Sequence, residues 1–273
     1  MKTKRKHILV LSGLKHNMDS TVKCAVHFAK LMNANVDFLY VKKPTEIVNQ
    51  ESQLSAIRSI NREQVEMEQK MKQILDPYSN TYGIHIKGKF SFGPVKDEIK
   101  EYLDRTAPDM VILGKRKSGP FKFKDDGVTD FVLSHFEGPV LIAPKATQLE
   151  PEKELSIGIL NDQKNDQKND SILELANQSA RPLKSFTIVD QYAKEELNAS
   201  NNEGQYTEFI FEKKDDVLSN VSNYVVKSKV NLLCFDRNDK ANTPQAQLLS
   251  TKEIINKINV PILFGGKTGF GLS

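Results

Sequence analysis

The sequence lacks the features that mark disulfide-rich, zinc-binding and membrane-spanning proteins. Only two of its 273 residues are cysteines, Cys24 and Cys234, which are too few for a disulfide framework or a zinc cluster. No apolar run approaches the ~18 residues that a membrane helix needs. The basic segment from Met1 to His7 leads into an apolar run too short for a signal peptide, so we expect a cytoplasmic protein.

The chain has little excess charge, and that excess is unevenly placed. It contains 39 Lys and Arg against 35 Asp and Glu, a formal net charge of +4. Divided at residue 150, the first half has 24 basic and 18 acidic residues (+6), and the second has 15 and 17 (−2). Part of the surplus lies in Lys115-Arg116-Lys117, followed by Lys122 and Lys124. Basic clusters of this kind either bind phosphate or remain solvated.

Short apolar runs alternate with amphipathic stretches along the first half. The runs are rich in β-branched residues, which is typical of parallel strands buried on both faces, and the stretches between them have helical spacing. The expected strands are His7–Leu11, Val36–Val41, Ile84–Phe90, Met110–Gly114 and Val140–Ala143, and the expected helices are Ser20–Met32, about Ser52–Leu75, Val95–Arg105 and Val128–Phe136. This order predicts right-handed crossovers and an open parallel sheet of the α/β class.

The expected helix of about Ser52–Leu75 is mostly polar, with a single stripe near heptad spacing. The stripe consists of Leu54, Ile57, Gln64, Met67, Met71 and Ile74. Such a stripe packs on the helix's own sheet or forms a surface for a partner, and the sequence leaves both alternatives open.

The end of the first half is repeated in the second half. From Val111 to Pro139 is 28 positions (139 − 111), and from Leu233 to Pro261 is again 28 (261 − 233). Each copy places a helix before its last strand, Thr251–Ile258 in the second copy. We therefore expect an internal duplication, with domains at 1–147 and 152–266.

The second copy is shorter than the first. From Leu9 to Val111 is 102 positions (111 − 9), whereas the matching interval from Ile157 to Leu233 is 76 (233 − 157). The missing 26 positions fall where the long second helix would be, between the expected strands 186–189 and 206–212. We also expect the closing strands 140–143 and 262–264 to pair, because their free edges would otherwise invite aggregation, so that the two copies form a pseudo-dimer.

Two segments carry a family resemblance. Asp109-Met-Val-Ile-Leu-Gly114-Lys-Arg-Lys-Ser118-Gly119 and Gly138-Pro-Val-Leu-Ile142 resemble the universal stress protein family, over the whole first half and, through the repeat, over the second. The resemblance implies two tandem Rossmann-like open parallel sheets of the adenine nucleotide alpha hydrolase-like type, with flanking helices and a trimmed second copy. It also implies a role in stress survival and dimerisation. Some members of the family bind ATP at the carboxyl ends of the strands, and others do not.

The family's nucleotide motif is Gly, two residues, Gly, nine residues, then Gly and Ser or Thr. Gly114 and Gly127 match its first and third glycines, and Val128 follows Gly127. The second glycine is either replaced by Lys117 or lost in a one-residue deletion. Gly13 stands where the nucleotide binders carry Asp. Backbone N–H groups of such a loop hold phosphates. The resemblance implies cofactor-binding roles for Ser12, Gly13, Val41, Gly114, Lys115, Ser118, Gly119, Gly127 and Thr129.

Other sites are not indicated. Gly266-Lys267-Thr268 resembles the end of a phosphate-binding loop, but position 261 is Pro instead of the required glycine. The five histidines show no metal-ligand spacing, and no catalytic constellation is visible. We therefore expect a non-catalytic regulatory or protective protein without metal, nucleic-acid or membrane partners, with an unidentified protein partner or a second copy. The alternative is an ATP- or AMP-binding sensor, with Mg, acting through the first domain.

Overall fold

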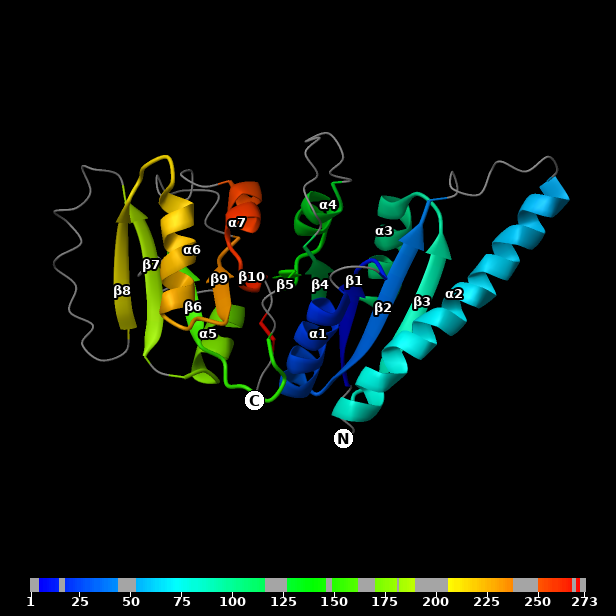
Figure 1. The fold of residues 1–273 in the computed structure, drawn as a ribbon, viewed down its shortest axis with the longest axis horizontal. Helices are drawn as coiled ribbons and strands as arrows, with labels where there is room; N and C mark the ends of the chain where they lie inside the picture. Colours follow the sequence, from blue (N-terminus) through cyan, green and yellow to red (C-terminus); the bar gives the residue numbers. More distant parts are fainter. Residues whose placement is uncertain are drawn as a thin grey trace.

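The computed structural model describes most of the chain, and its described residues build one continuous sheet (Figure 1). These residues are 5–14, 18–43, 53–115, 127–145, 149–161, 170–180, 182–189, 206–237, 250–266 and 269–270. The strands are β1 (Lys6–Leu11), β2 (Ala34–Lys42), β3 (Ile86–Phe92), β4 (Met110–Gly114), β5 (Val140–Ala143), β6 (Ile157–Leu160), β7 (Leu183–Val189), β8 (Tyr206–Glu212), β9 (Leu232–Phe235) and β10 (Ile262–Phe264). The helices are α1 (Met18–Met32), α2 (Gln53–Tyr82), α3 (Val95–Thr106), α4 (Val128–His135), α5 (Asp170–Asn177), α6 (Val217–Lys227) and α7 (Thr251–Lys257).

The strand order in the sheet is β3-β2-β1-β4-β5-β10-β9-β6-β7-β8. All pairs within each half are parallel, as predicted, and the two halves are joined where β5 and β10 pair antiparallel. The predicted pairing of the closing strands is therefore confirmed. The positions proposed for the domain boundaries remain a prediction.

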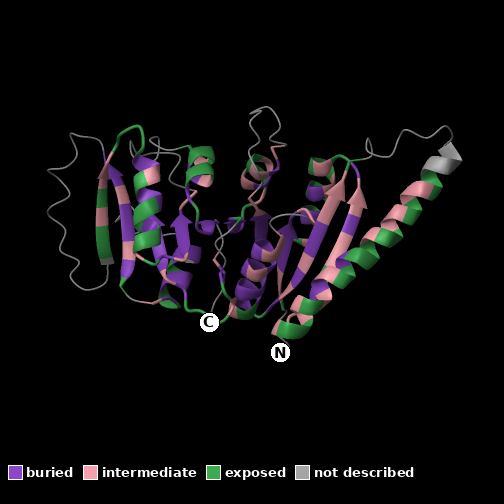
Figure 2. Cartoon of the chain, in the orientation of Figure 1, coloured by how far each residue is buried: buried purple, intermediate pink, exposed green. Residues whose placement is uncertain are grey.

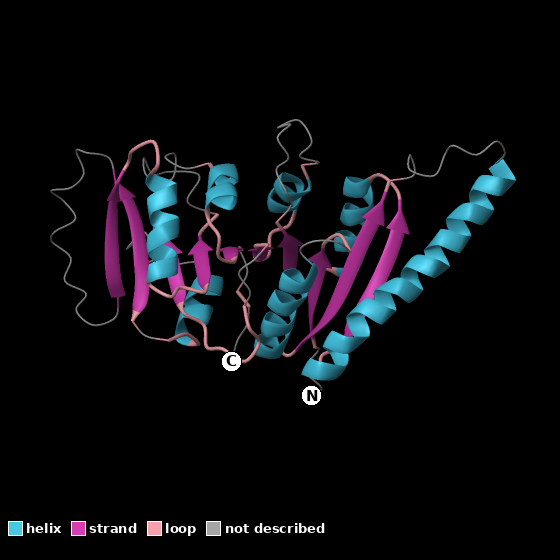
Figure 3. Cartoon of the chain, in the orientation of Figure 1, coloured by secondary structure: helices cyan, strands magenta, loops and turns pink. Residues whose placement is uncertain are grey.

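Helices cover both faces of the sheet, which gives three layers (Figure 3). One face packs buried side chains of α1, α2 and α5, and the other packs those of α3, α4, α6 and α7. Each of the two apolar clusters includes residues from both halves of the chain. The halves thus share their cores as well as their sheet. None of the described helices is long and apolar enough to cross a membrane.

The long helix α2 packs on the sheet mainly through its C-terminal part. Met71 and Leu75 are buried over β3, whereas Ile57 and Val65 are each 54% exposed. The N-terminal part of α2 runs beyond the sheet, and Figure 2 shows it as a mixture of exposed and intermediate residues. The prediction that the stripe packs on its own sheet holds for Met71. It does not hold for Ile57.

The predicted end of this helix was wrong. The helix continues past Leu75 to Tyr82 and includes Pro77. Tertiary contacts stabilise the last turns, because the Tyr78 hydroxyl donates to Asp19 at 2.7 Å and Lys30 lies over the ring of Tyr82. These contacts offset the backbone hydrogen bond that a proline removes from a helix interior.

The outer strands of the second half are less apolar than those of the first on the face that α2 covers in the first half. In β2 and β3 this face carries Val36, Phe38, Tyr40, Ile86, Phe90 and Phe92. In β7 and β8 the alternation places there Leu183, Ser185, Thr187, Val189, Glu208, Ile210 and Glu212, of which Leu183 and Val189 are buried. This face of the second half therefore offers fewer apolar side chains for a long helix to cover. Residues 190–205 between β7 and β8 lie outside the described part of the chain, so the loss of the helix remains a prediction.

The C-terminal segment crosses back to the first half. After β10, Gly266 lies so close to the first half that a Cβ there would be 2.4 Å from the carbonyl carbon of Gly138. Phe270 is 2% exposed, and its ring stacks on that of Phe28 in α1 at 6.0 Å between centroids. Phe270 thus belongs to the core of the half in which the chain began.

Candidate functional site

The carboxyl ends of β1 and β4 bring together two of the residues implied by the resemblance. A Cβ placed on Gly114 would lie 2.9 Å from the Oγ of Ser12 and 2.9 Å from the Oγ1 of Thr21. Thr21 is fully buried in the first turns of α1, and Ser12 is 8% exposed. Two hydroxyls and a glycine backbone therefore meet near the N-terminal end of a helix, where N–H groups favour anions. Thr21 was not predicted, although a hydroxyl residue early in the helix after β1 is a signal that could have indicated it.

Gly13 lies beside this cluster in open space. Apart from its chain neighbours, no atom of the described residues lies within 4 Å of where its Cβ would be, and the Oγ of Ser12 donates to its carbonyl at 3.2 Å. A carboxylate side chain would fit at this position, where the sequence has glycine. Val41 does not belong to this cluster of hydroxyls, because it packs against the apolar cluster on the face of the sheet opposite α1.

Lys115 directs its ammonium group toward the second half. Its backbone N–H donates to the carbonyl of Ala143 at 2.8 Å, and its Nζ donates to the carbonyls of Asn256 at 3.2 Å and Ile258 at 2.9 Å. Burial lowers the pKa of Lys115, and the nearby charge of Lys145 lowers it further. The side chain is therefore engaged at the end of α7.

The remaining implied residues lie at the start of α4 or outside the described residues. Gly127 adopts the left-handed backbone (φ 62°) before α4, and a Cβ there would lie 3.1 Å from the Nζ of Lys96. Thr129 is half-buried in the first turn of the helix. Ser118 and Gly119 fall outside the described residues. The structure thus brings Ser12, Gly13 and Gly114 together, whereas Gly127 and Thr129 lie at the start of α4.

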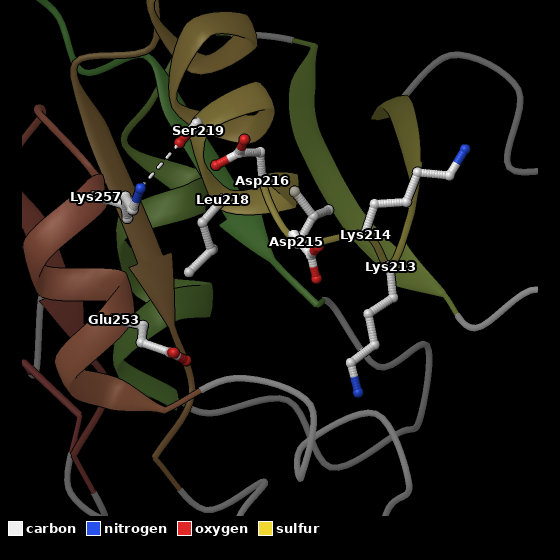
Figure 4. Close-up of a pocket in the computed structure, with 9 residues that line it drawn as sticks. Lys213, Lys214, Asp215, Asp216, Leu218, Ser219, Glu253 and Lys257 are labelled. Carbon is white, nitrogen blue, oxygen red and sulfur yellow. Dashed lines mark hydrogen bonds between the residues drawn. The ribbon is translucent and has the colours of Figure 1, made fainter.

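A cavity of about 350 Å³ lies in the second half between the N-terminus of α6 and α7 (Figure 4). No sequence motif indicated this cavity. Its charged lining residues are Lys213, Lys214, Asp215, Asp216, Glu253 and Lys257. Three cations and three anions line it, so the net charge of the lining is zero. One hydrogen bond, from Lys257 to the Oγ of Ser219 at 3.4 Å, crosses it.

Metal and thiol chemistry find no support in the described residues. Among them, no group of three His, Cys, Asp or Glu side chains could hold a metal ion. Both cysteines are buried and free of disulfides. Burial raises the pKa of Cys24 to about 12 and also raises that of Cys234, so neither thiol ionises readily.

Comparison with known proteins gives the following likenesses. The model of the universal stress protein family matches residues 4–144, which is more than half of the chain. A universal stress protein from Archaeoglobus fulgidus has a similar structure (TM-score 0.65, 14% identity, 95% of this chain and 96% of that one). So do a putative universal stress protein from Pseudomonas aeruginosa UCBPP-PA14 (0.59, 14%, 95% and 92%) and a protein of unknown function from P. aeruginosa PAO1 (0.58, 14%, 96% and 93%). At these identities the likeness concerns the fold. No curated protein matches the sequence.

Proposed function

Because the chain belongs to the universal stress protein family, we propose that it is a non-catalytic interaction module of the stress response that works without a bound nucleotide. One observation carries this proposal. Lys115, the first basic residue after the glycine at the end of β4, binds carbonyl oxygens of α7, so its charge is not directed at the strand ends where a phosphate would lie.

The neighbouring positions support the same proposal. Gly13 stands where the family's nucleotide binders carry an acidic residue, and nothing in the described chain replaces that carboxylate beside Ser12. Of the residues described at this edge of the sheet, Gly13 supplies no carboxylate and Lys115 directs its charge elsewhere, so a ligand that needs both groups is poorly matched here.

Thermal denaturation with and without Mg-ATP or Mg-AMP tests the proposal. A ligand present at ~100 times its dissociation constant stabilises the folded state by about 2.7 kcal/mol, which raises the Tm of a chain of this size by several degrees. We expect no rise in Tm at millimolar nucleotide. A rise of several degrees for the unmodified protein would refute the proposal.

The Gly13→Asp variant makes the same measurement sharper. The space around Gly13 accepts a side chain, so the variant should fold normally while regaining the acidic group. If the missing carboxylate is what prevents binding, Mg-ATP should raise the Tm of Gly13→Asp and not that of the matched Gly13→Asn. If both variants behave like the unmodified protein, the position of the Lys115 charge is the stronger obstacle.

Survival under stress tests the cellular part of the proposal. A strain lacking this protein should be rescued equally by the unmodified protein and by Gly13→Leu, which fills the space at the strand ends. Rescue by the unmodified protein alone would show that the space is needed. Absence of rescue by either would refute the stress role.

A second candidate function is adenine-nucleotide sensing in the first half. The meeting of Ser12, Thr21 and Gly114 beside the start of α1 favours it, because hydroxyls and helix N–H groups bind phosphate oxygens. For this function, Mg-ATP should raise the Tm of the unmodified protein, and Ser12→Ala should reduce that rise. Without nucleotide, Ser12→Ala should lower the free energy of unfolding by no more than about 1 kcal/mol.

A further inference from the structure

One contact is made twice, in opposite directions, across the joint between the two halves. Arg237 follows β9 in the second half, and its guanidinium reaches the end of α4 in the first half. It donates to the carbonyls of Leu133 (3.2 Å), Phe136 (2.8 Å), Glu137 (3.0 Å) and Gly138 (2.6 Å), and to that of Gly265 in its own half (2.8 Å). Lys115 follows β4 in the first half and binds the end of α7 in the second, as described above.

The two contacts are related by the internal repeat. Arg237 lies 122 positions after Lys115 (237 − 115), and Ile258 lies 122 positions after Phe136 (258 − 136). The same shift relates Pro261 to Pro139, which begin the paired closing strands. Each contact therefore occupies the equivalent place in its own copy. This is the pattern of an isologous interface, in which one patch meets its own image.

The chemistry of helix ends explains why a cation belongs at both places. The last carbonyls of a helix have no partner within it, and they carry the negative end of its dipole. Phe136 and Ile258 are the residues that end α4 and α7, and their carbonyls accept from Arg237 and Lys115 respectively. Burial lowers the pKa of Arg237, so this charge is partly removed from water, and its five hydrogen bonds compensate for that loss.

We propose that Lys115 and Arg237 form a reciprocal latch, in which each half of the chain holds the last helix of the other half. A change at the loop that follows β4 then alters α7, and a change at the loop that follows β9 alters α4. The latch gives the two halves a conformational link that does not depend on any nucleotide. It shares the Lys115 contact with the function proposed above, but hydrogen exchange tests the latch and nucleotide titration tests that function, so either can fail without the other.

Hydrogen exchange of the full-length protein tests the latch, because the expected effect lies in the half that was not changed. In Lys115→Met, the amides of α7 up to Ile258 should exchange roughly tenfold faster, whereas those of α4 should keep their rates. In Arg237→Met, the amides near the end of α4, including that of Phe136, should exchange faster, and those of α7 should not. A purely local role would instead speed exchange beside the substituted residue.

Two further variants keep the result interpretable. Lys100→Met makes the same substitution at an exposed lysine of α3 in the first half, and it should leave exchange in α4 and α7 unchanged. If Arg237→Met does not fold, Arg237→Lys keeps the charge and loses the planar fork, and it should still speed exchange at the end of α4 first. Faster exchange confined to the substituted half, in either direction, would overturn the proposal, as would equal acceleration throughout the chain.

Discussion

Phe270 offers a direct test of whether the two halves share one core. Its ring is 2% exposed and stacks on Phe28, although the two residues lie at opposite ends of the chain. Phe270→Ala removes this ring from the cluster that also contains Leu155 and Leu263. The variant therefore perturbs a contact between a tail that follows the second half and a helix of the first.

The expected loss is large. Truncation of a buried Phe to Ala typically costs ~3–5 kcal/mol, because a cavity remains where the ring was. Burial of ~150–250 Å² at ~25 cal/mol per Å² gives an upper bound of about 4–6 kcal/mol, which agrees with that range. An unfolding entropy of ~2.1 cal/mol/K per residue amounts to roughly 0.57 kcal/mol/K for this chain, so the Tm should fall by roughly 5–9 °C.

Urea and thermal denaturation followed by circular dichroism measure this loss, since the chain has no tryptophan to serve as a fluorescent probe. Val226→Ala is the matched control. Val226 is 56% exposed on α6, so its truncation should change the free energy of unfolding by no more than about 0.5 kcal/mol. If Phe270→Ala costs as little as Val226→Ala, the tail does not contribute to the core and the reasoning is refuted.

Three further outcomes follow from contacts elsewhere. Gly266→Ala should lower the free energy of unfolding by about 1–3 kcal/mol in urea titrations, because its Cβ would lie 2.4 Å from the backbone of Gly138; unchanged stability would contradict so close an approach. Burial lowers the pKa of His27, so below about pH 6.5 the unfolded chain binds a proton that the folded chain does not. The free energy of unfolding should therefore decrease as the pH is lowered, by up to ~1.4 kcal/mol per pH unit. His27→Gln should flatten this slope between pH 7 and 5, and an unchanged slope would assign it to other groups. Tyr102→Phe should cost about 1.5–3 kcal/mol at neutral pH by removing the 2.6 Å bond to Asp37. Burial opposes ionisation of Asp37, but bonds from its neighbours hold its pKa below the usual value, so this cost should shrink in acid as the carboxylate becomes protonated; a cost independent of pH would count against the bond.

The strands and most helices could be predicted from the sequence because local pattern determines them. Continuous β-branched runs such as Val140–Ala143 have few alternatives to a buried strand, and the observed bounds of β4 and β5 agree with the prediction. The end of α2 could not be predicted in the same way. Pro77 argues locally for a stop, and only the contacts of Tyr78 and Tyr82 with distant elements reverse that preference.

The role of Lys115 was even less accessible to sequence reasoning. Its neighbours in the chain are basic and glycine-rich, which is typical of a phosphate loop. Its acceptors, the carbonyls of Asn256 and Ile258, lie more than 140 positions away and become adjacent only through the antiparallel pairing of β5 with β10. The repeat interval shows that Lys115 and Arg237 occupy equivalent positions, but nothing in the sequence shows that their side chains reach from one half of the chain to the other.

The small size of the β5–β10 junction has a consequence for how such a chain can vary. Only three residue pairs join the two strands, from Val140 with Phe264 to Ile142 with Ile262. If the copies were separate subunits, formation of this ladder would depend on their concentration. A covalent connection holds the copies at an effective concentration in the millimolar range, so association no longer depends on the amount of protein. Each surface then no longer has to match a copy of itself, so the two surfaces can acquire different substitutions. The lysine at position 115 and the arginine at the equivalent position 237 are such a difference.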